Sequence, residues 1–160
     1  MKRLKTGIFA VALIANSATA QVNPPPDLVR AAVTCAIAFT GGSVKQKVLA
    51  KDGWSVETAN IVAKNYASAL GLTAYGRGTS TANVLVGNFE GQPACLAIGP
   101  VPASTNNEEY AAKVLSILKP EKTVRDGTDY VMKKLGRIFV LNLPDDGSER
   151  VAVIRVIKQD

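Results

Sequence analysis

The chain has 160 residues, a formal net charge of +6 from 19 Lys and Arg against 13 Asp and Glu, and no histidine. The missing histidine excludes Ser-His-Asp and Cys-His catalysis and histidine zinc sites, so an enzyme is not the favoured interpretation and we expect no metal or cofactor. The basic residues are scattered, with Lys133-Lys134 as their longest run, so the basic patch of a nucleic-acid-binding protein is missing as well.

Residues 1–20 have the pattern of a secretory signal peptide. A basic start at 2–5 precedes a short apolar run at 8–15, and Ala18 and Ala20 supply the small residues that signal peptidase requires. The apolar run is far shorter than the roughly 20 residues that span a bilayer. We therefore expect cleavage after Ala20, a periplasmic or secreted protein and no permanent membrane anchor. The alternative is a flexible apolar N-terminus on a cytosolic protein.

Removal of residues 1–20 lowers the charge and leaves enough chain for one domain. Three of the 19 basic residues and none of the 13 acidic ones lie in this segment, so the remainder carries a net charge of only +3. The 140 remaining residues suffice for a single domain with its own hydrophobic core and are too few for two domains that each have a stable core. We place that domain at 27–160, after a proline-rich lead at 21–26 that is not expected to form a regular helix.

The two cysteines, Cys35 and Cys95, predict one disulfide in an oxidising compartment. The bond would close a loop of about 61 residues, worth about 4 kcal/mol in the chain-entropy model. A redox-active pair is disfavoured because the two residues lack Cys-x-x-Cys spacing. Two buried free thiols remain the other alternative.

The first half of the domain has helical patterns. Residues 27–39 are apolar on most sides of a helix, which is typical of a buried core helix. A capping-box pattern predicts a short helix over 44–51. Ser55 is positioned to cap the next helix, which Gly71 would end, and 75–81 has the composition of a loop.

Strand patterns begin at 83–89 and 94–99, joined by a hairpin turn at 90–93. The second strand turns small residues to the same face as Cys95. These small side chains would let the helix that carries Cys35 approach closely, as a disulfide requires.

The last third ends in the strongest hairpin pattern of the chain. Thr105 begins a capping-box pattern for a helix that reaches Leu118, before Pro120. For 121–136 the sequence is ambiguous: residues 129–135 fit either a helical turn or a strand, and we expect a short helix or a loop. Strands at 137–143 and 150–157 flank a turn rich in Asp and Gly.

The final hairpin has two apolar faces. We pair Phe139 with Ile154 and Leu141 with Ala152. One face then carries Phe139, Leu141, Leu143, Ala152, Ile154 and Val156. The opposite face carries Ile138, Val140, Val151, Val153 and Arg155, with Asn142. This second face must be covered either by another helix or by a partner chain.

The order of elements predicts an α+β fold. We expect a single small two-layer domain in which antiparallel β-hairpins pack against three to four helices, with one disulfide. We expect the C-terminal strand to lie at an edge of the sheet, where it could accept an added strand and support a homo-oligomer.

One loop and one turn are candidate ligand sites. The loop at 75–81 combines backbone N–H groups with a basic side chain that could hold an anion, through Gly76, Arg77, Gly78 and Thr79. A mobile surface loop is the alternative. The turn at 145–149 gathers Asp145, Asp146 and Glu149 as weak calcium sites do, but it lacks EF-hand spacing, and the turn needs Asp and Gly for its own backbone.

Two patterns could serve a small cell-wall hydrolase. Ser116 and Lys119 have the Ser-x-x-Lys spacing of a serine nucleophile and its base, but the other motifs of such enzymes are missing. Asp126 and Asp129 could supply a carboxylate pair. Chance occurrence is the favoured interpretation of both.

The sequence therefore favours a non-catalytic exported domain that binds another envelope protein, as an accessory, inhibitor or immunity-type factor does. The expected contact residues are Ile138, Val140, Val151, Val153 and Arg155. The alternatives are an anion-binding protein that uses Arg77 and its flanking residues, and a small cell-wall hydrolase.

Overall fold

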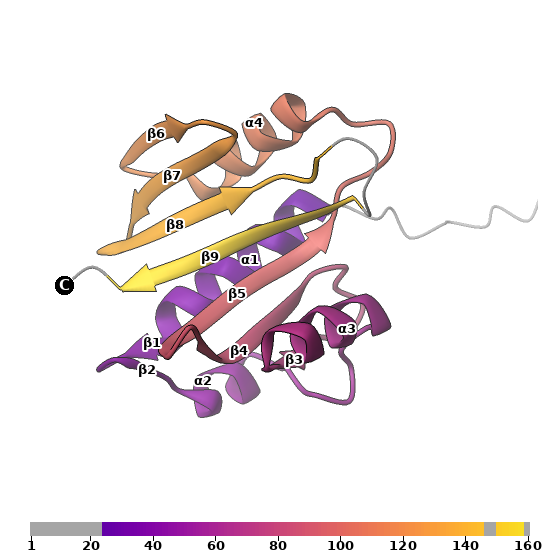
Figure 1. Cartoon of the computed structure of the whole chain (residues 1–160), viewed down its shortest axis with the longest axis vertical. Helices are drawn as coiled ribbons and strands as arrows, with labels where there is room; N and C mark the ends of the chain where they lie inside the picture. Colours follow the sequence, from indigo (N-terminus) through magenta and orange to yellow (C-terminus); the bar gives the residue numbers. More distant parts are fainter. Residues whose placement is uncertain (1–23, 146–149, 159–160) are drawn as a thin grey trace, which may run out of the picture.

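The computed structural model describes residues 24–145 and 150–158 (Figure 1). The expected signal peptide at 1–20 lies outside the described residues, and so do residues 21–23 of the expected lead. Within the described part of the chain, no helix is both long and apolar enough to cross a membrane.

Seven strands form one antiparallel sheet in the order β3-β4-β5-β9-β8-β7-β6 (Figure 1). Their bounds are Leu72–Tyr75 for β3, Asn83–Phe89 for β4, Gln92–Pro100 for β5, Lys122–Asp126 for β6, Asp129–Lys134 for β7, Arg137–Asn142 for β8 and Val151–Lys158 for β9. A separate pair joins β1 (Phe39–Thr40) to β2 (Ser43–Val44). Because β9 pairs with both β5 and β8, the expectation that the C-terminal strand is an edge strand is wrong.

The described helices are α1 (Pro24–Ala38), α2 (Gln46–Lys51), α3 (Ile61–Leu70) and α4 (Asn107–Leu118). Helices α1 and α4 pack on one face of the sheet, and α3 lies on the opposite face over β3 and β4 (Figure 1). The predicted α+β class, with antiparallel strands packed against helices, is confirmed. Helix α3 adds a third layer over one part of the sheet.

The predicted disulfide between Cys35 and Cys95 is present and joins α1 to β5. The two Cα atoms are 5.6 Å apart, within the usual range for a bridge, and both side chains are fully buried. The side chains beside Cys95 on this face of β5 are small, since Ala97 is fully buried and Gly99 lies next to Leu28 of α1.

Helix α1 begins earlier than the sequence pattern indicates. It starts at Pro24, so the expectation of a non-helical lead is wrong for residues 24–26. Proline is tolerated in the first turn because the N–H groups there have no intrahelical acceptor. Asp27, also in the first turn, accepts hydrogen bonds from the backbone N–H and the hydroxyl of Thr81, at 2.7 and 2.8 Å.

Three helix caps differ from the predicted ones. The expected capping box before α2 is absent, since α2 follows Lys45 without a side-chain cap. Asn60 caps α3 in place of Ser55, and its side chain accepts a hydrogen bond from the Ala63 N–H at 2.9 Å. Asn106 caps α4 in place of Thr105. Asn is as good an N-cap as Ser or Thr, so neighbouring candidates cannot be ranked by type alone.

The segment 121–136 is a β-hairpin, and the expected short helix or loop is wrong. Strands β6 and β7 meet at a turn that contains Gly127, whose φ is +60°, and Asp126 pairs with Asp129. All five residues of β6 are exposed, so the alternation of buried and exposed side chains that marks a strand is missing from its sequence.

The last hairpin has the predicted faces in a shifted register. Phe139 pairs with Val156 and Leu141 with Ile154, two residues away from the expected partners. A shift of two residues keeps every side chain on its face. The predicted core residues Phe139, Leu141, Ala152, Ile154 and Val156 are therefore all buried.

Candidate functional site

One face of the sheet is covered by a helix along only part of its width. Over β3 to β5, α3 buries a compact apolar cluster that includes Leu85, Leu96 and Ile98. Over β6, β7 and β8, no described helix packs on this face (Figure 1). We call the uncovered part the open face, formed by the side chains of Lys122, Val124, Asp126, Asp129, Val131, Lys133, Ile138, Val140, Asn142, Val151, Val153, Arg155 and Ile157.

The structure brings the five residues expected to contact a partner together on β8 and β9. Arg155 is exposed, whereas Ile138, Val151 and Val153 are half-buried and Val140 is 8% exposed. Val151 and Val153 adjoin the cluster under α3, and Val140 is shielded by its neighbours in the sheet. The apolar strip is thus covered at one margin by the cluster under α3; over β8 no described helix covers it, although Ile138 is half-buried and Val140 is buried.

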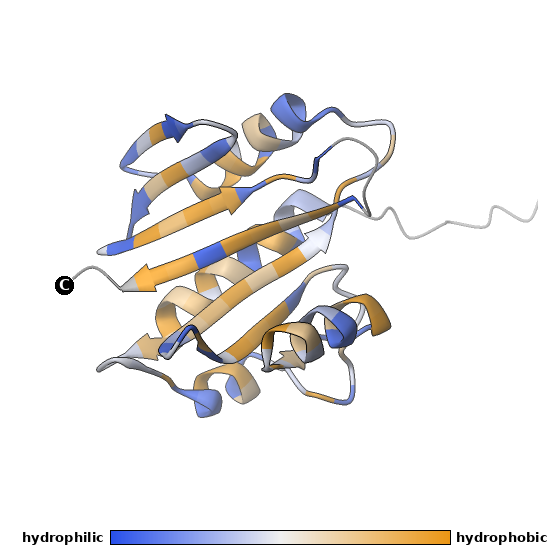
Figure 2. Cartoon of the chain, in the orientation of Figure 1, coloured by the Kyte–Doolittle hydropathy of each residue, from blue (hydrophilic) through white to orange (hydrophobic). Residues whose placement is uncertain are grey.

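The open face is larger than the sequence indicates. Val131 pairs with Val140, and Val124 pairs with Val131, so the apolar strip continues to the sheet edge. Val124 and Ile157 are 50% and 37% exposed. The sequence does not place Val124 and Val131 on this face, because a short helix or a loop is expected where β6 and β7 lie. Figure 2 shows the apolar colouring along most of β8 and β9.

Charges border the apolar strip on β6 and β7. Lys122 lies opposite Lys133 on one side of it, and Asp126 lies opposite Asp129 on the other. Arg155 lies in the strip itself, opposite Val140. Among the described residues, Arg155 has no hydrogen bond or ion pair, which leaves its guanidinium group free for a ligand.

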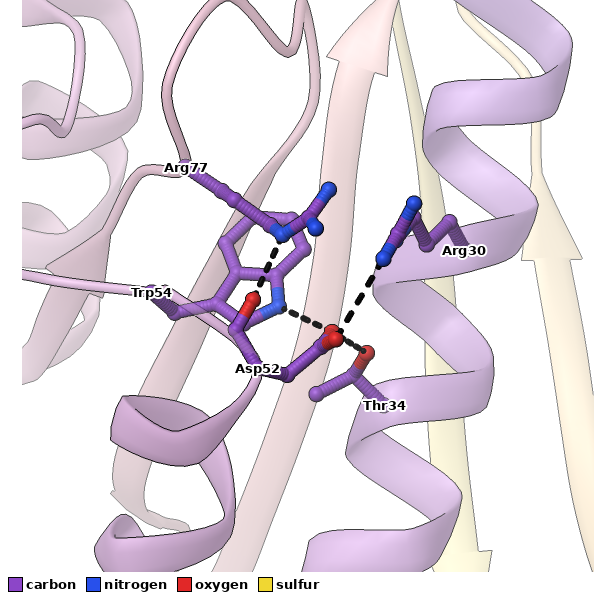
Figure 3. Close-up of polar contacts among 5 residues, drawn as sticks. All are labelled: Arg30, Thr34, Asp52, Trp54 and Arg77. Atoms are coloured by element: carbon purple, nitrogen blue, oxygen red, sulfur yellow. Dashed lines mark hydrogen bonds and ion pairs between the residues drawn. The ribbon is translucent and has the colours of Figure 1, made fainter.

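The loop proposed to bind anions holds a neighbouring segment of the chain. Gly76 exchanges backbone hydrogen bonds of 2.8 Å with Ser55, and a Cβ at this position would lie 2.1 Å from the Thr58 carbonyl oxygen. The Arg77 side chain donates through Nε to the Asp52 carbonyl oxygen at 2.5 Å (Figure 3). Gly78 and Thr79 are exposed. These contacts favour a structural role for Gly76 and Arg77.

A polar cluster around Asp52 was not expected from the sequence. Its carboxylate accepts hydrogen bonds from Thr34 Oγ1 at 2.9 Å, Trp54 Nε1 at 3.0 Å and Arg30 at 3.3 Å (Figure 3). Burial raises the pKa of Asp52, but these three hydrogen bonds and the charge of Arg30 outweigh it and hold the pKa below 3.8. The cluster ties α1 to the chain that follows α2.

This cluster would be hard to find from sequence. From their residue types alone, Asp52 and Gly53 indicate only that a helix ends there. The donor Thr34 lies 18 residues away on another helix, and no spacing rule connects the two.

The candidate hydrolase residues do not form a catalytic arrangement. Ser116 donates its hydroxyl to the Lys113 carbonyl oxygen at 2.8 Å, and Lys119 ends α4 with a left-handed backbone. Both side chains are exposed. Asp126 and Asp129 are cross-strand neighbours at the β6–β7 turn.

Other titratable and acidic groups do not complete a site either. Burial, with the charge of Asp27, raises the pKa of Tyr110 well above its usual value, so this phenol stays protonated and donates to the Pro100 carbonyl oxygen at 3.3 Å.

Asp146 and Glu149 of the candidate calcium turn lie outside the described residues. Within residues 24–145 and 150–158, no group of three His, Cys, Asp or Glu side chains could hold a metal ion.

Comparison with known proteins adds no family to this description. No family model, no curated protein and no solved structure matches the chain. Among the surfaces described above, the geometry of the chain favours the open face as the functional site.

Proposed function

We propose that this protein is an exported, non-catalytic domain that binds another envelope protein through the open face, as an accessory, inhibitor or immunity-type factor does. One observation carries the proposal. The apolar residues of the sheet continue across β9, β8 and β7 beyond the point where the helix cover ends. An uncovered apolar strip with a polar border is typical of a protein-binding surface.

The chemistry of the face indicates what a partner must offer. β-branched side chains form the floor and would pack against apolar side chains of the partner. Arg155 lies in this floor without a countercharge among the described residues. A carboxylate of the partner would form an ion pair with its guanidinium group. Arginine surrounded by apolar contacts is a common source of binding energy in interfaces.

The disulfide supports export, because such bonds persist in oxidising compartments and are rare in the cytosol. The alternative of an anion-binding loop receives less support, since Arg77 is already bound to the Asp52 carbonyl group. Mass spectrometry of the native protein tests export: a chain that begins at Gln21 supports it, and an intact Met1 contradicts it.

Photo-crosslinking tests the binding surface. A photoreactive residue at Ile157, which is 37% exposed, should capture one envelope protein that mass spectrometry identifies. The same residue at Ile37, 56% exposed on the helical side, is the matched control and should not capture it. A partner captured equally from both positions would contradict the assignment to the open face.

Affinity measurements with the identified partner then test the role of Arg155. Arg155→Glu places a like charge against the expected carboxylate and should weaken binding about tenfold or more. Ile37→Asp should leave the affinity unchanged. Both variants must keep the wild-type circular dichroism spectrum and disulfide. Binding that survives Arg155→Glu unchanged would refute the proposed contact.

A further inference from the structure

Strand β6 is an open edge of the sheet. Its five residues are all exposed, and among the described residues it pairs with β7 alone (Figure 1). The opposite edge, β3, has four residues and is followed directly by a bridge between Gly76 and Ser55. β6 contains no proline, and a strand edge of this kind offers its free N–H and C=O groups to another strand.

Two like-charge pairs end at this edge without a countercharge. Lys122 lies opposite Lys133, and Asp126 lies opposite Asp129, on the same face of the sheet. Among the described residues, none of these four side chains forms an ion pair. Like charges directly opposite one another destabilise a sheet, so each pair would gain from an opposite charge on the free side of β6.

The sequence of β6, Lys122-Thr123-Val124-Arg125-Asp126, is complementary to itself when two copies run antiparallel. A two-fold axis at Val124 places Lys122 of each copy opposite Asp126 of the other. Val124 then lies opposite Val124, and Thr123 opposite Arg125. The first two kinds of pair fall on the open face, and the third falls on the face that carries α4.

Other registers fit less well. Paired residues in a continuous sheet share a face, so the axis must pass through a residue. An axis at Arg125 sets two arginines against each other, and an axis at Thr123 leaves Asp126 without a partner in β6. Only the axis at Val124 uses the whole strand and neutralises both like-charge pairs.

We propose that the protein forms a homodimer in which β6 of one copy pairs antiparallel with β6 of the second copy about Val124. Such an interface is isologous and closes after two copies. The axis stands perpendicular to the sheet, so both open faces lie on the same side and form one continuous floor. The dimer would therefore present two copies of the proposed binding surface together.

Sedimentation velocity of the purified, disulfide-bonded chain at low salt tests this dimer. The wild type should sediment at twice the monomer mass and dissociate on dilution. Lys122→Asp and Asp126→Lys each replace two attractive pairs by two repulsive ones, so each should weaken self-association about tenfold or more. Lys47→Asp, an exposed charge change on α2, should have no effect.

Variants that exchange the charges at positions 122 and 126 test the register of the two β6 strands. The double variant with Lys122→Asp and Asp126→Lys restores opposite charges across the axis and should dimerise like the wild type. The two single variants, each with weakened self-association alone, should form a heterodimer when mixed. A monomeric wild type, single variants that dimerise normally, or a mixture that stays monomeric would overturn the proposal. Since the measurement involves no partner protein, its outcome is independent of the proposed function.

Discussion

The two halves of the sheet differ in what covers them, and a single row of side chains shows the difference. This row crosses the sheet on the face that α3 partly covers, through Leu85, Leu96, Arg155, Val140, Val131 and Val124. Leu85 beneath α3 is 1% exposed, whereas Val124 at the β6 edge is 50% exposed. Equally apolar residues thus serve as core at one end of the row and as surface at the other.

This contrast separates stability from interaction. The covered half has helices on both faces and contains the disulfide between α1 and β5, so most of the core lies there. The other half has helices on one face and leaves the open face and the β6 edge uncovered. Substitutions of core residues in the covered half should therefore change the free energy of unfolding, whereas substitutions of exposed residues on the open face and the β6 edge should change binding and self-association.

Reduction of the disulfide should have the largest effect on the covered half. The bond closes a loop with a sequence separation of 60 residues. Its loss should lower the free energy of unfolding by about 4 kcal/mol, because the unfolded chain regains the entropy of the open loop. Guanidinium denaturation with and without reductant measures this.

The double variant Cys35→Ala/Cys95→Ala is the control for the disulfide. Its denaturation midpoint should lie below that of the oxidised wild type and should not respond to reductant. An equal midpoint for the oxidised and reduced wild type would show that the bond does not stabilise the fold.

Gly76→Ala should have an intermediate effect, at the margin of the covered half. The added Cβ would lie 2.1 Å from the Thr58 carbonyl oxygen, which is backbone and cannot rotate away. We expect a loss of about 1–3 kcal/mol in the free energy of unfolding, as for other overpacked sites. Urea denaturation gives this value.

Gly99→Ala on β5 is the matched control for Gly76. A Cβ there would meet its nearest neighbour, Ala82 Cβ, at an ordinary contact distance of 3.5 Å. Its free energy of unfolding should stay within about 0.5 kcal/mol of the wild type. Equal effects of the two alanines would contradict the close approach of the 55–58 segment to Gly76.

Asp52→Asn should have the smallest effect, and the effect should depend on pH. The carboxylate accepts three side-chain hydrogen bonds that an amide reproduces poorly, so we expect a loss of about 1 kcal/mol near neutral pH. Folding holds the Asp52 pKa below 3.8, so its stabilising contribution is present above that pH and is lost as pH falls through the folded-state value.

Urea denaturation of wild type and Asp52→Asn from about pH 7 to about pH 2.5 checks the sign, since the difference between the two free energies of unfolding should narrow as the pH falls below 3.8. A constant difference across this range would contradict the lowered pKa.

The elements that the sequence predicts well are those whose pattern is local. Apolar residues on both sides of a turn predict the hairpin of β4 and β5, and β4 has the predicted bounds. Its turn at Glu90 and Gly91 has positive φ at both residues, as a two-residue hairpin turn requires. The face of Cys95 followed from the strand period alone.

The candidate site was predictable in part. Alternation placed the five expected contact residues on one face of β8 and β9, and the structure shows them there. Val124 and Val131 do not follow from the sequence. Strand β6 is exposed along its whole length, so its sequence lacks the alternation of buried and exposed residues that would predict a strand. The cluster around Asp52 does not follow from the sequence because Arg30 and Thr34 reach Asp52 from another helix.

By itself, the sequence determined the α+β class, the disulfide and the two faces of the last hairpin, because each follows from residue type and the period of a strand or helix. The tertiary structure decided the order of the strands, with β9 at the centre, and the extent of the cover by α3. These depend on which surfaces pack against each other across long separations, and no local period encodes that choice.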